Sequence, residues 1–268
     1  MEIPRTGPPR APVGRPKPRT ALRFSDAVTR IRTIPVHAIV KQVYPRPVRE
    51  GDELAMAIGR AIDGTLSRIG HEARLGRRLS GATARLYATE LLDTALEESA
   101  IDLSPLERER TLLQIDRVVE SFRRSEIFGL DRPRTRVILI DNSVGVYAQP
   151  DYWDGRSRII EMKSYLAIPP PPDIALQLRL FQLAFPQFEC TLFCLNRHSV
   201  PVDTARLCVP PPTAEESSET LRLAYSIAAE HGEPKVLEYM QGPFVPYSLA
   251  GGPAPEPMSA PEDPVRGP

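Results

Sequence analysis

No apolar run in the sequence approaches the roughly 20 residues that a membrane-spanning helix needs. The N-terminus also has no hydrophobic segment of the kind found in secretory signal peptides, so we expect a soluble cytoplasmic protein without a membrane partner. Cysteine is scarce, with three in 268 residues, and their spacing predicts neither a disulfide framework nor a zinc site. Net charge is absent too, because 34 basic side chains balance 34 acidic ones. Any attraction to nucleic acid must therefore come from local clusters of charge.

The three cysteines are Cys190, Cys194 and Cys208. Each lies in an apolar stretch rich in the residue types of β-strands. Thiols in such surroundings are usually buried, and a reducing compartment keeps them free. The sequence therefore predicts three buried free thiols.

Proline, in contrast, is abundant. The 30 prolines are about twice the average usage and gather towards the two ends of the chain. Residues 1–23, rich in arginine and proline, predict a disordered basic arm, and residues 243–268 predict a disordered tail rich in proline and glycine. Residues 24–242 then form one domain, since 41% of the chain is hydrophobic and can supply a single core.

The first half of this domain has the apolar spacing of helices. Two amphipathic helices are expected over residues 52–68 and 80–99. A third has Ser104 as its N-cap, Pro105 at its first position and Glu107 completing a capping box, and it ends near Gly129. These segments predict a group of helices ahead of the sheet.

After residue 129 the apolar spacing changes to alternation or to continuous runs, which is typical of strands. Three strands of a meander are expected first, then a helix, two more strands and a last helix. Their ranges are 136–140, 144–153, 158–165, 173–185, 188–196, 205–209 and 214–231. The order predicts an α/β fold with a central mixed β-sheet flanked by helices, preceded by additional N-terminal helices.

The hairpin between the second and third of these strands carries charged residues. If its loop spans 155–157, with Asp154 opposite Arg158, then Asp151 lies across from Glu161 with Cβ atoms about 4.5 to 5.5 Å apart. Side chains alternate along a strand, so Lys163 shares the face of Glu161 and Met162 points to the other. Two carboxylates and a lysine therefore meet at one place.

Adjacent carboxylates on apolar strands repel one another and are costly to desolvate. A divalent cation removes this cost, and Mg²⁺ is often held by one or two carboxylates together with water and phosphate oxygens. Asp151 and Glu161 supply that number, and the carbonyl oxygen of Met162 is a further candidate ligand. Lys163 would orient or deprotonate the attacking water and offset charge in the transition state.

These residues resemble the PD-(D/E)xK nuclease superfamily, specifically its RecB-type branch. The matching motifs are Pro150-Asp151, Glu161-Met162-Lys163 and, on the following helix, Gln177 with Phe181 in place of a tyrosine. The resemblance covers residues 105–196 and implies a restriction-endonuclease-like core. It also implies DNA hydrolysis with Mg²⁺ or Mn²⁺, in which Asp151, Glu161, Lys163 and Gln177 form the catalytic group. No helicase motif is present, so a helicase or another repair or defence protein would act in trans.

Two similar motifs elsewhere in the chain are not expected to form such a site. Glu233-Pro-Lys235 contains a proline next to a helix end, which argues against a strand. Pro172-Asp173 lies at the start of a helix. Neither is placed in a hairpin, so neither would bring two acids together.

The resemblance also implies a metal ligand on an N-terminal helix, usually a histidine after a glycine. We favour His71, which follows Gly70, and Asp63 is the first alternative. Glu90 and Glu120 would serve if the ligand is a helical glutamate. One branch, the CRISPR-adaptation nucleases, carries an iron-sulfur cluster held by four cysteines, and no cluster is expected with three.

Substrate contacts are expected from basic residues near these positions. Arg74, Arg77 and Arg78 surround His71, and Arg179 follows Gln177 on its helix. Such residues would bind phosphates without regard to sequence, although a solvated helix face explains them equally well. Tyr152 would stack on a base at a frayed or single-stranded end.

Two other functions fit the sequence. A nuclease fold that has lost turnover would serve as a nucleic-acid-binding or assembly subunit. A protein-interaction scaffold would recruit partners through its proline-rich ends and leave the central charges incidental. Cleavage assays with variants of Asp151 and Lys163 separate these alternatives from a nuclease.

Overall fold

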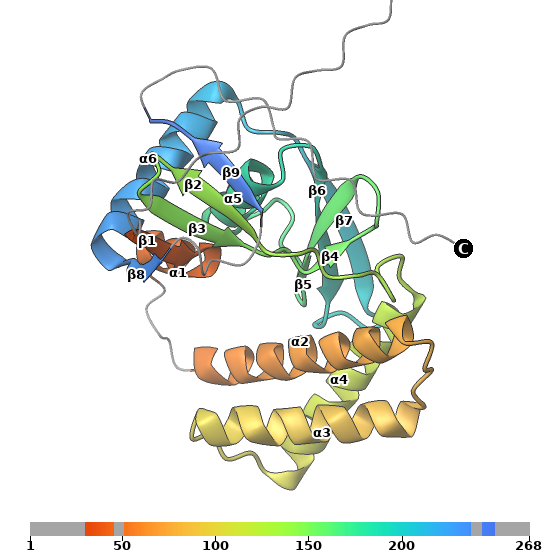
Figure 1. Cartoon of the computed structure of the whole chain (residues 1–268). Coiled ribbons are helices and arrows are strands. Elements are labelled where there is room, and N and C mark those ends of the chain that lie inside the picture. Colours follow the sequence, from red (N-terminus) through yellow and green to blue (C-terminus); the bar gives the residue numbers. More distant parts are fainter. Residues whose placement is uncertain (1–29, 46–50, 237–242, 250–268) are drawn as a thin grey trace, which may run out of the picture.

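The computed structural model describes residues 30–45, 51–236 and 243–249. Within these ranges the chain forms six helices and two mixed sheets (Figure 1). The helices are α1 (Val36–Val43), α2 (Asp52–Arg74), α3 (Gly81–Glu98), α4 (Pro105–Arg124), α5 (Pro172–Ala184) and α6 (Ala214–His231). The strands are β1 (Arg30–Pro35), β2 (Arg136–Ile140), β3 (Val144–Ala148), β4 (Tyr152–Trp153), β5 (Arg158–Lys163), β6 (Glu189–Asn196), β7 (Asp203–Val209), β8 (Glu233–Val236) and β9 (Phe244–Tyr247). The predicted α/β class is confirmed, and no helix in the described ranges is long and apolar enough to cross a membrane.

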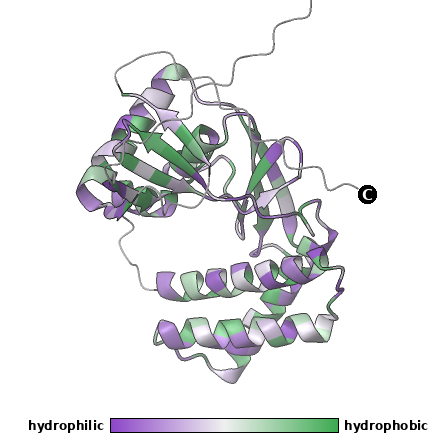
Figure 2. Cartoon of the chain, in the orientation of Figure 1, coloured by the Kyte–Doolittle hydropathy of each residue, from purple (hydrophilic) through white to green (hydrophobic). Residues whose placement is uncertain are grey.

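The strands are divided between two sheets. The first has the order β8-β1-β3-β2-β9, and the second has the order β4-β5-β6-β7. Each combines parallel and antiparallel pairs, with β1 parallel to β3 in the first sheet and β5 parallel to β6 in the second. Figure 2 shows hydrophobic residues along the strands of both sheets, while hydrophilic residues alternate with them on α2 and α3.

Helices α2, α3 and α4 pack together and cover one face of the second sheet. Their buried residues, among them Ile62, Leu92 and Phe122, form one core with Ile160 and Phe193 of the sheet. The capping box predicted at Ser104 and Glu107 is present and begins α4 with Pro105 in its first turn. This helical layer places α2 beside the strands that carry the predicted acids.

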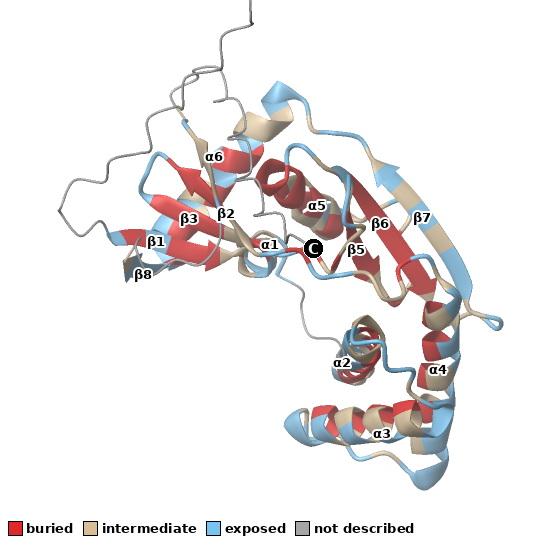
Figure 3. Ribbon diagram, turned by 45° about the vertical axis from the view of Figure 1, so that its right-hand side comes forward, coloured by how far each residue is buried: buried red, intermediate tan, exposed pale blue. Residues whose placement is uncertain are grey.

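A second core fills the space between the two sheets. Helix α5 lies there and is buried along most of its length, together with β6 (Figure 3). Helices α1 and α6 complete the same core from the side of the first sheet. Strand β5 is therefore buried on both faces, with Ile159 in this core and Ile160 and Met162 in the helical one. The predicted alternation of side chains along β5 is confirmed.

The segment predicted as one strand over 144–153 is broken. Strand β3 ends at Ala148 and pairs with β2 in the first sheet, whereas β4 begins at Tyr152 and pairs with β5 in the second. The break contains Pro150, which has no N–H to donate to a sheet. The expected single meander is thus two hairpin pairs in different sheets, and the chain crosses between the sheets at Gln149–Asp151.

Three strands correct the sequence analysis. Strand β1 lies in the first half of the domain, where only helices were expected, and pairs with β3 and β8. Glu233-Pro-Lys235, where proline was taken to exclude a strand, lies in β8 at the edge of the first sheet, and an edge strand tolerates a missing N–H. Residues 244–247 form β9, parallel to β2, so the domain extends past the predicted boundary at 242. The apolar side chains of Phe244 and Tyr247 pack on the sheet. Residues 1–23 and 250–268 of the predicted arm and tail lie outside the described residues.

The cysteines differ from expectation at one position. Cys190 and Cys194 are buried free thiols, as predicted, but Cys208 is exposed. Both buried thiols lie on β6, an inner strand covered on both faces. Cys208 lies on β7, the edge strand of the second sheet, whose residues alternate between exposed and half-buried.

Candidate active site

The hairpin of β4 and β5 has the register expected from the sequence. Tyr152 pairs with Ile160 and Trp153 with Ile159. The N–H of Asp154 donates to the carbonyl oxygen of Arg158 at 3.1 Å, which closes the loop. The predicted register is confirmed, and it directs Asp151 towards the end of β5 that carries Glu161.

Asp154 holds the hairpin loop in place. Its Oδ1 accepts hydrogen bonds from the N–H groups of Arg156, Ser157 and Arg158, each at 2.9 Å. Burial alone would raise the pKa of Asp154, but these three bonds and the Arg158 guanidinium outweigh it and lower the pKa to about 2. The carboxylate therefore stays charged and fixes the loop that sets the register.

Replacing Asp154 with alanine should destabilise the protein by about 1–3 kcal/mol, because three backbone N–H groups and the Arg158 guanidinium lose their charged acceptor. Because the folded pKa lies below the unfolded value of 3.8, this stabilisation is present above pH 3.8 and is lost as the pH falls towards about 2. Urea unfolding at several pH values measures it. Arg156→Ala is the control, since that residue contributes only its backbone N–H to the loop. Equal stability of both variants at pH 7 would contradict this account.

Asp151 is anchored by the backbone of the opposite strand. Its Oδ2 accepts a hydrogen bond from the N–H of Met162 at 2.9 Å. If the pairing of β4 with β5 continued, Met162 would lie opposite Pro150, which has no N–H to donate to β5. The Asp151 carboxylate lies at this position instead. The N–H and carbonyl of one strand residue point to the same side. The Met162 carbonyl oxygen therefore points to the same side as Asp151. A third oxygen ligand of a cation would need this orientation.

Glu161 is the most deeply buried acid of the group, with 4% of its surface exposed. Its Oε1 accepts hydrogen bonds from Lys163 Nζ at 2.7 Å and from Gln177 Nε2 at 2.8 Å. Burial, followed by the negative charge of Asp151, raises the pKa of Glu161 to about 8, against the opposing effect of Lys163. The charges of the two carboxyl groups thus interact, and Lys163 offsets only part of the increase in pKa.

Lys163 is the cation of this group. Burial lowers its pKa, but the charges of Glu161 and Asp151 and the hydrogen bond to Glu161 have the larger combined effect and raise it. The ammonium group therefore remains protonated at neutral pH. This favours an electrostatic and hydrogen-bonding contribution from Lys163 over proton abstraction.

Asp63, the first alternative for the helical ligand, faces this group from α2. It is accessible to water but lies among enough protein atoms to be partly desolvated, and desolvation together with the charge of Asp151 raises its pKa to about 6. Lys163, Arg197 and Arg132 act in the opposite direction. Asp63 therefore shares an electrostatic environment with Asp151 and Lys163.

The other candidates for the helical ligand lie elsewhere. His71 is exposed on α2, eight residues from Asp63, which is about 12 Å along the helix. Glu90 pairs with Arg68 at 3.1 Å on the surface of the helical layer. Glu120 pairs with Arg123 at 3.2 Å on α4. Of the four, Asp63 is the one whose pKa reports interaction with the predicted acids.

The expected substrate contacts are not gathered in one patch. Arg77 and Arg78 are exposed beyond the end of α2, and Arg74 is held by the carbonyl oxygen of Leu130 at 3.0 Å. Arg179 forms an ion pair with Glu216 at 3.0 Å. These positions are compatible with surface phosphate contacts, most directly for the two exposed arginines.

Tyr152 cannot stack on a base in this structure. Only 3% of its surface is exposed, and its ring lies 6.0 Å from that of Phe122 in the helical core. The alternation of β4 places it opposite Ile160, on the face covered by α4. Tyr152 is therefore no part of the proposed substrate surface.

Arg197 was not predicted from the sequence. It follows β6 and is buried, with its N–H donating to the carbonyl oxygen of Ser164 at 3.2 Å just after Lys163. The signal that would have located it is the parallel pairing of β5 and β6, which puts Lys163 beside Cys194 and brings the carboxyl ends of both strands together. The sequence predicts both strands but not this pairing.

The arrangement suits a hard divalent cation, though not as a ready-made cage. Among the described residues, no three acidic, histidine or cysteine side chains stand close enough together to hold a metal ion. The carboxylates of Asp151 and Glu161 and the carbonyl of Met162 are all oxygen donors, which suits Mg²⁺ with water completing its shell. A cation bound there would also offset the burial and the Asp151 charge that raise the pKa of Glu161. The residues present therefore fit Mg²⁺ or Mn²⁺.

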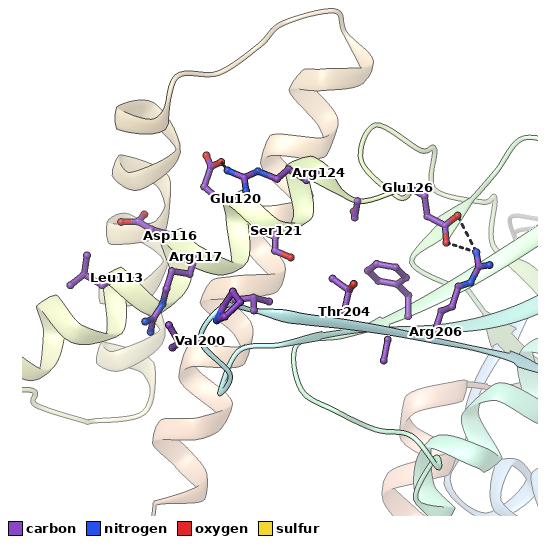
Figure 4. Close-up of a pocket in the computed structure, with 15 residues that line it drawn as sticks. Leu113, Asp116, Arg117, Glu120, Ser121, Arg124, Glu126, Val200, Thr204 and Arg206 are labelled. Atoms are coloured by element: carbon purple, nitrogen blue, oxygen red, sulfur yellow. Dashed lines mark hydrogen bonds and ion pairs between the residues drawn. The ribbon is translucent and has the colours of Figure 1, made fainter.

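A groove of about 1200 Å³ lies between α4 and β7 (Figure 4), and neither Asp151 nor Glu161 lines it. Acidic and basic side chains alternate along it, including Glu120, Arg124 and the ion pair of Glu126 with Arg206. The mixed charge gives no preference for a polyanion. We place the candidate active site at Asp151 and Glu161 because Lys163 and Gln177 meet them there.

Comparison with known proteins gives no family for the chain. No protein-family model matches it, and no curated protein matches it either. A solved structure named SSO0001 is 12% identical with a TM-score of 0.30, over 74% of this chain and 85% of that one. A structure from Eubacterium rectale named Putative exonuclease is 12% identical with a TM-score of 0.35, over 73% and 91%. Likeness at this level carries no argument about activity.

Proposed function

We propose that the protein is a metal-dependent nuclease that hydrolyses phosphodiester bonds of DNA. The observation that carries the proposal is the group formed by Asp151, Glu161, Lys163 and Gln177 at the crossing between the sheets. Two adjacent carboxyl groups, one with a pKa raised to about 8, face the half-buried ammonium group of Lys163. Two buried carboxylates repel one another and are costly to desolvate. A bound cation would reduce this cost and could assist phosphoryl transfer.

Each residue has a distinct part in this proposal. Asp151 and Glu161 would hold the cation together with the Met162 carbonyl, and Asp63 would reach it through a coordinated water. Lys163 stays protonated, orients the attacking water by hydrogen bonding and faces the negative charge that develops on the phosphate. Gln177 fixes the rotamer of Glu161 through its 2.8 Å hydrogen bond. Arg77 and Arg78 contact phosphates farther along the strand.

The bound cation would lower the pKa of a coordinated water and neutralise charge on the phosphate. Its binding has a consequence that does not depend on turnover. Mn²⁺ at about 100 times its dissociation constant should stabilise the folded protein by about 2.7 kcal/mol, which is about 5–10 °C in melting temperature for a chain of this size. Differential scanning fluorimetry with Mn²⁺ and with a chelator measures the shift.

Asp151→Asn should abolish this shift, and Glu233→Gln should retain it. Glu233 belongs to the other Glu-x-Lys motif and is exposed on the edge strand β8, so it controls for nonspecific binding to surface carboxylates. If Mn²⁺ stabilises Asp151→Asn as much as the wild type, the ion binds elsewhere and the proposed metal site is refuted.

A catalytically inactive, nucleic-acid-binding or assembly subunit is the second candidate. One observation favours it: Glu161 already accepts hydrogen bonds from both Lys163 and Gln177, so a cation must compete with Lys163 for Oε1. An inactive subunit would bind DNA equally well as wild type and as Lys163→Met, and neither would cut it. A nuclease would bind DNA in both forms but cut it only as wild type.

A further inference from the structure

Arg197 joins three parts of the fold at the edge of the candidate site. Its N–H donates to Ser164 O, and its carbonyl oxygen accepts from Gln114 Nε2 of α4 at 2.8 Å. Its Nη2 donates to the carbonyl oxygen of Ala55 on α2 at 3.2 Å. With 8% of its surface exposed, this arginine links the end of β5 to two helices of the helical layer.

The guanidinium packs on a face of α2 that is made of small residues, and this face continues to Asp63. Ala55, Gly59 and Asp63 are spaced four residues apart and so lie along one side of the helix. A Cβ built on Gly59 would lie 3.5 Å from Arg197 Nη1, so the absence of a larger side chain leaves room for the guanidinium. One turn farther along, Asp63 is attracted by the same arginine.

The guanidinium has no ion pair within 4.0 Å in the part of the chain that the structure describes, and its other contact is from Nε to His198 Nε2 at 3.3 Å. A buried arginine without a carboxylate at contact distance is costly. The hydrogen bonds of the guanidinium are to one backbone carbonyl, that of Ala55, and to the neighbouring His198 ring, and such contacts fix position more than they neutralise charge. The arrangement is that of a clamp between segments.

We propose that Arg197 is a positioning residue that fixes α2 against the carboxyl ends of β5 and β6, and thereby sets Asp63 opposite Asp151 and Glu161. The inference rests on the proposed function only in taking Asp63 as a residue that contacts the metal through a coordinated water. Arg197 acts through Asp63 and need not touch the substrate. Displacements of about 1 Å in a catalytic group are enough to cost roughly 100-fold in rate, so a clamp at this point matters for the chemistry.

The position of α2 is measured directly by distances between two spin labels. One label is attached to the exposed Cys208 of β7 and the other to Met56→Cys on α2, where Met56 is 49% exposed. Arg197→Met should widen or shift the distance distribution, and Arg197→Lys should restore part of the narrow distribution through one hydrogen bond. Arg85→Met is the control, because Arg85 ties α3 to Asp116 and Glu109 of α4 away from the site. An unchanged distribution in Arg197→Met would overturn the proposal.

Gly59 gives an independent test if Arg197→Met does not fold. Gly59→Ala should be tolerated, since its Cβ makes an ordinary contact at 3.5 Å. Gly59→Val should displace the guanidinium and reproduce the change in the distance distribution. Identical distributions in the alanine and valine variants would count against the clamp.

A double-mutant cycle separates positioning of Asp63 from general stabilisation. Arg197→Met should reduce Mn²⁺ affinity and cleavage by about 10- to 100-fold, but Arg197→Met with Asp63→Asn should be no worse than Asp63→Asn alone. Additive losses would mean that Arg197 does not act through Asp63. If the wild type binds no Mn²⁺ and cuts no DNA, the proposed function fails, while the spin-label distances still decide whether Arg197 positions α2.

Discussion

Lys163→Met should lower the rate of DNA cleavage by about 10³-fold, within the range that a positioned proton-transferring or charge-stabilising side chain contributes. Lys163 lies 2.7 Å from Glu161 and is the protonated group that faces both acids. Methionine keeps much of the side-chain length and removes the charge. Because Lys163 contributes a fixed positive charge, Lys163→Arg should retain more activity than Lys163→Met. Single-turnover cleavage of a labelled duplex measures the chemical step.

The control for this prediction is Lys235→Met. Lys235 is the lysine of the other Glu-x-Lys motif, exposed on β8, and its loss should leave the cleavage rate unchanged. Binding of DNA should be similar in all three variants. A Lys163→Met protein that cuts DNA at the wild-type rate would show that the cleavage does not arise at this site.

Asp63→Asn should reduce activity by at least about 10- to 100-fold, the usual cost of disturbing even an outer-shell partner of a metal, whereas His71→Ala should change it by about twofold or less. Asp63 is coupled to Asp151 through space, while His71 is exposed about two turns farther along α2. Cleavage and Mn²⁺ titrations of both variants provide the comparison. The reverse order of effects would restore His71 as the helical ligand.

The stability of the metal-free protein should show the opposite trend for Asp63→Asn. The folded pKa of Asp63 is about 6, above the unfolded value of 3.8, so the folded state binds the proton more tightly between these values. The wild type therefore loses the stability contributed by Asp63 as the pH rises from 3.8 to about 6. The Asp63→Asn variant does not titrate at this position and keeps its stability over this range. In a chelator, the melting temperature of Asp63→Asn relative to wild type should rise across this range and level off above it. A constant difference would contradict the proximity of Asp63 to Asp151.

Features with a local cause were predictable from the sequence. Helix α4 begins where Ser104, Pro105 and Glu107 specify a cap, and α6 has the range 214–231 that its spacing predicts. The register of the β4–β5 hairpin follows from a three-residue loop held by Asp154. Because this register alone places Asp151 near Glu161, the centre of the site was also within reach of sequence reasoning.

Features that depend on partners distant in the chain were not predictable. Strands β8 and β9 form because β1 and β2 have free edges with which they pair. Strand β8 also contains Pro234, and strand propensity therefore argues against it. The choice between Asp63 and His71 depends on where α2 crosses β5 and β6, which the apolar spacing of the helix does not specify. Arg197 required knowledge that β5 and β6 are parallel.

The most direct test of the central claim is cleavage of linear, nicked and single-stranded DNA by wild type and Asp151→Asn, with Mg²⁺ or Mn²⁺ and with a chelator. The wild type should cut at least one of these substrates with the cation and none in the chelator, and Asp151→Asn should cut none at a comparable rate. Equal cleavage by both proteins, or no cleavage by folded wild type with either cation, would contradict it.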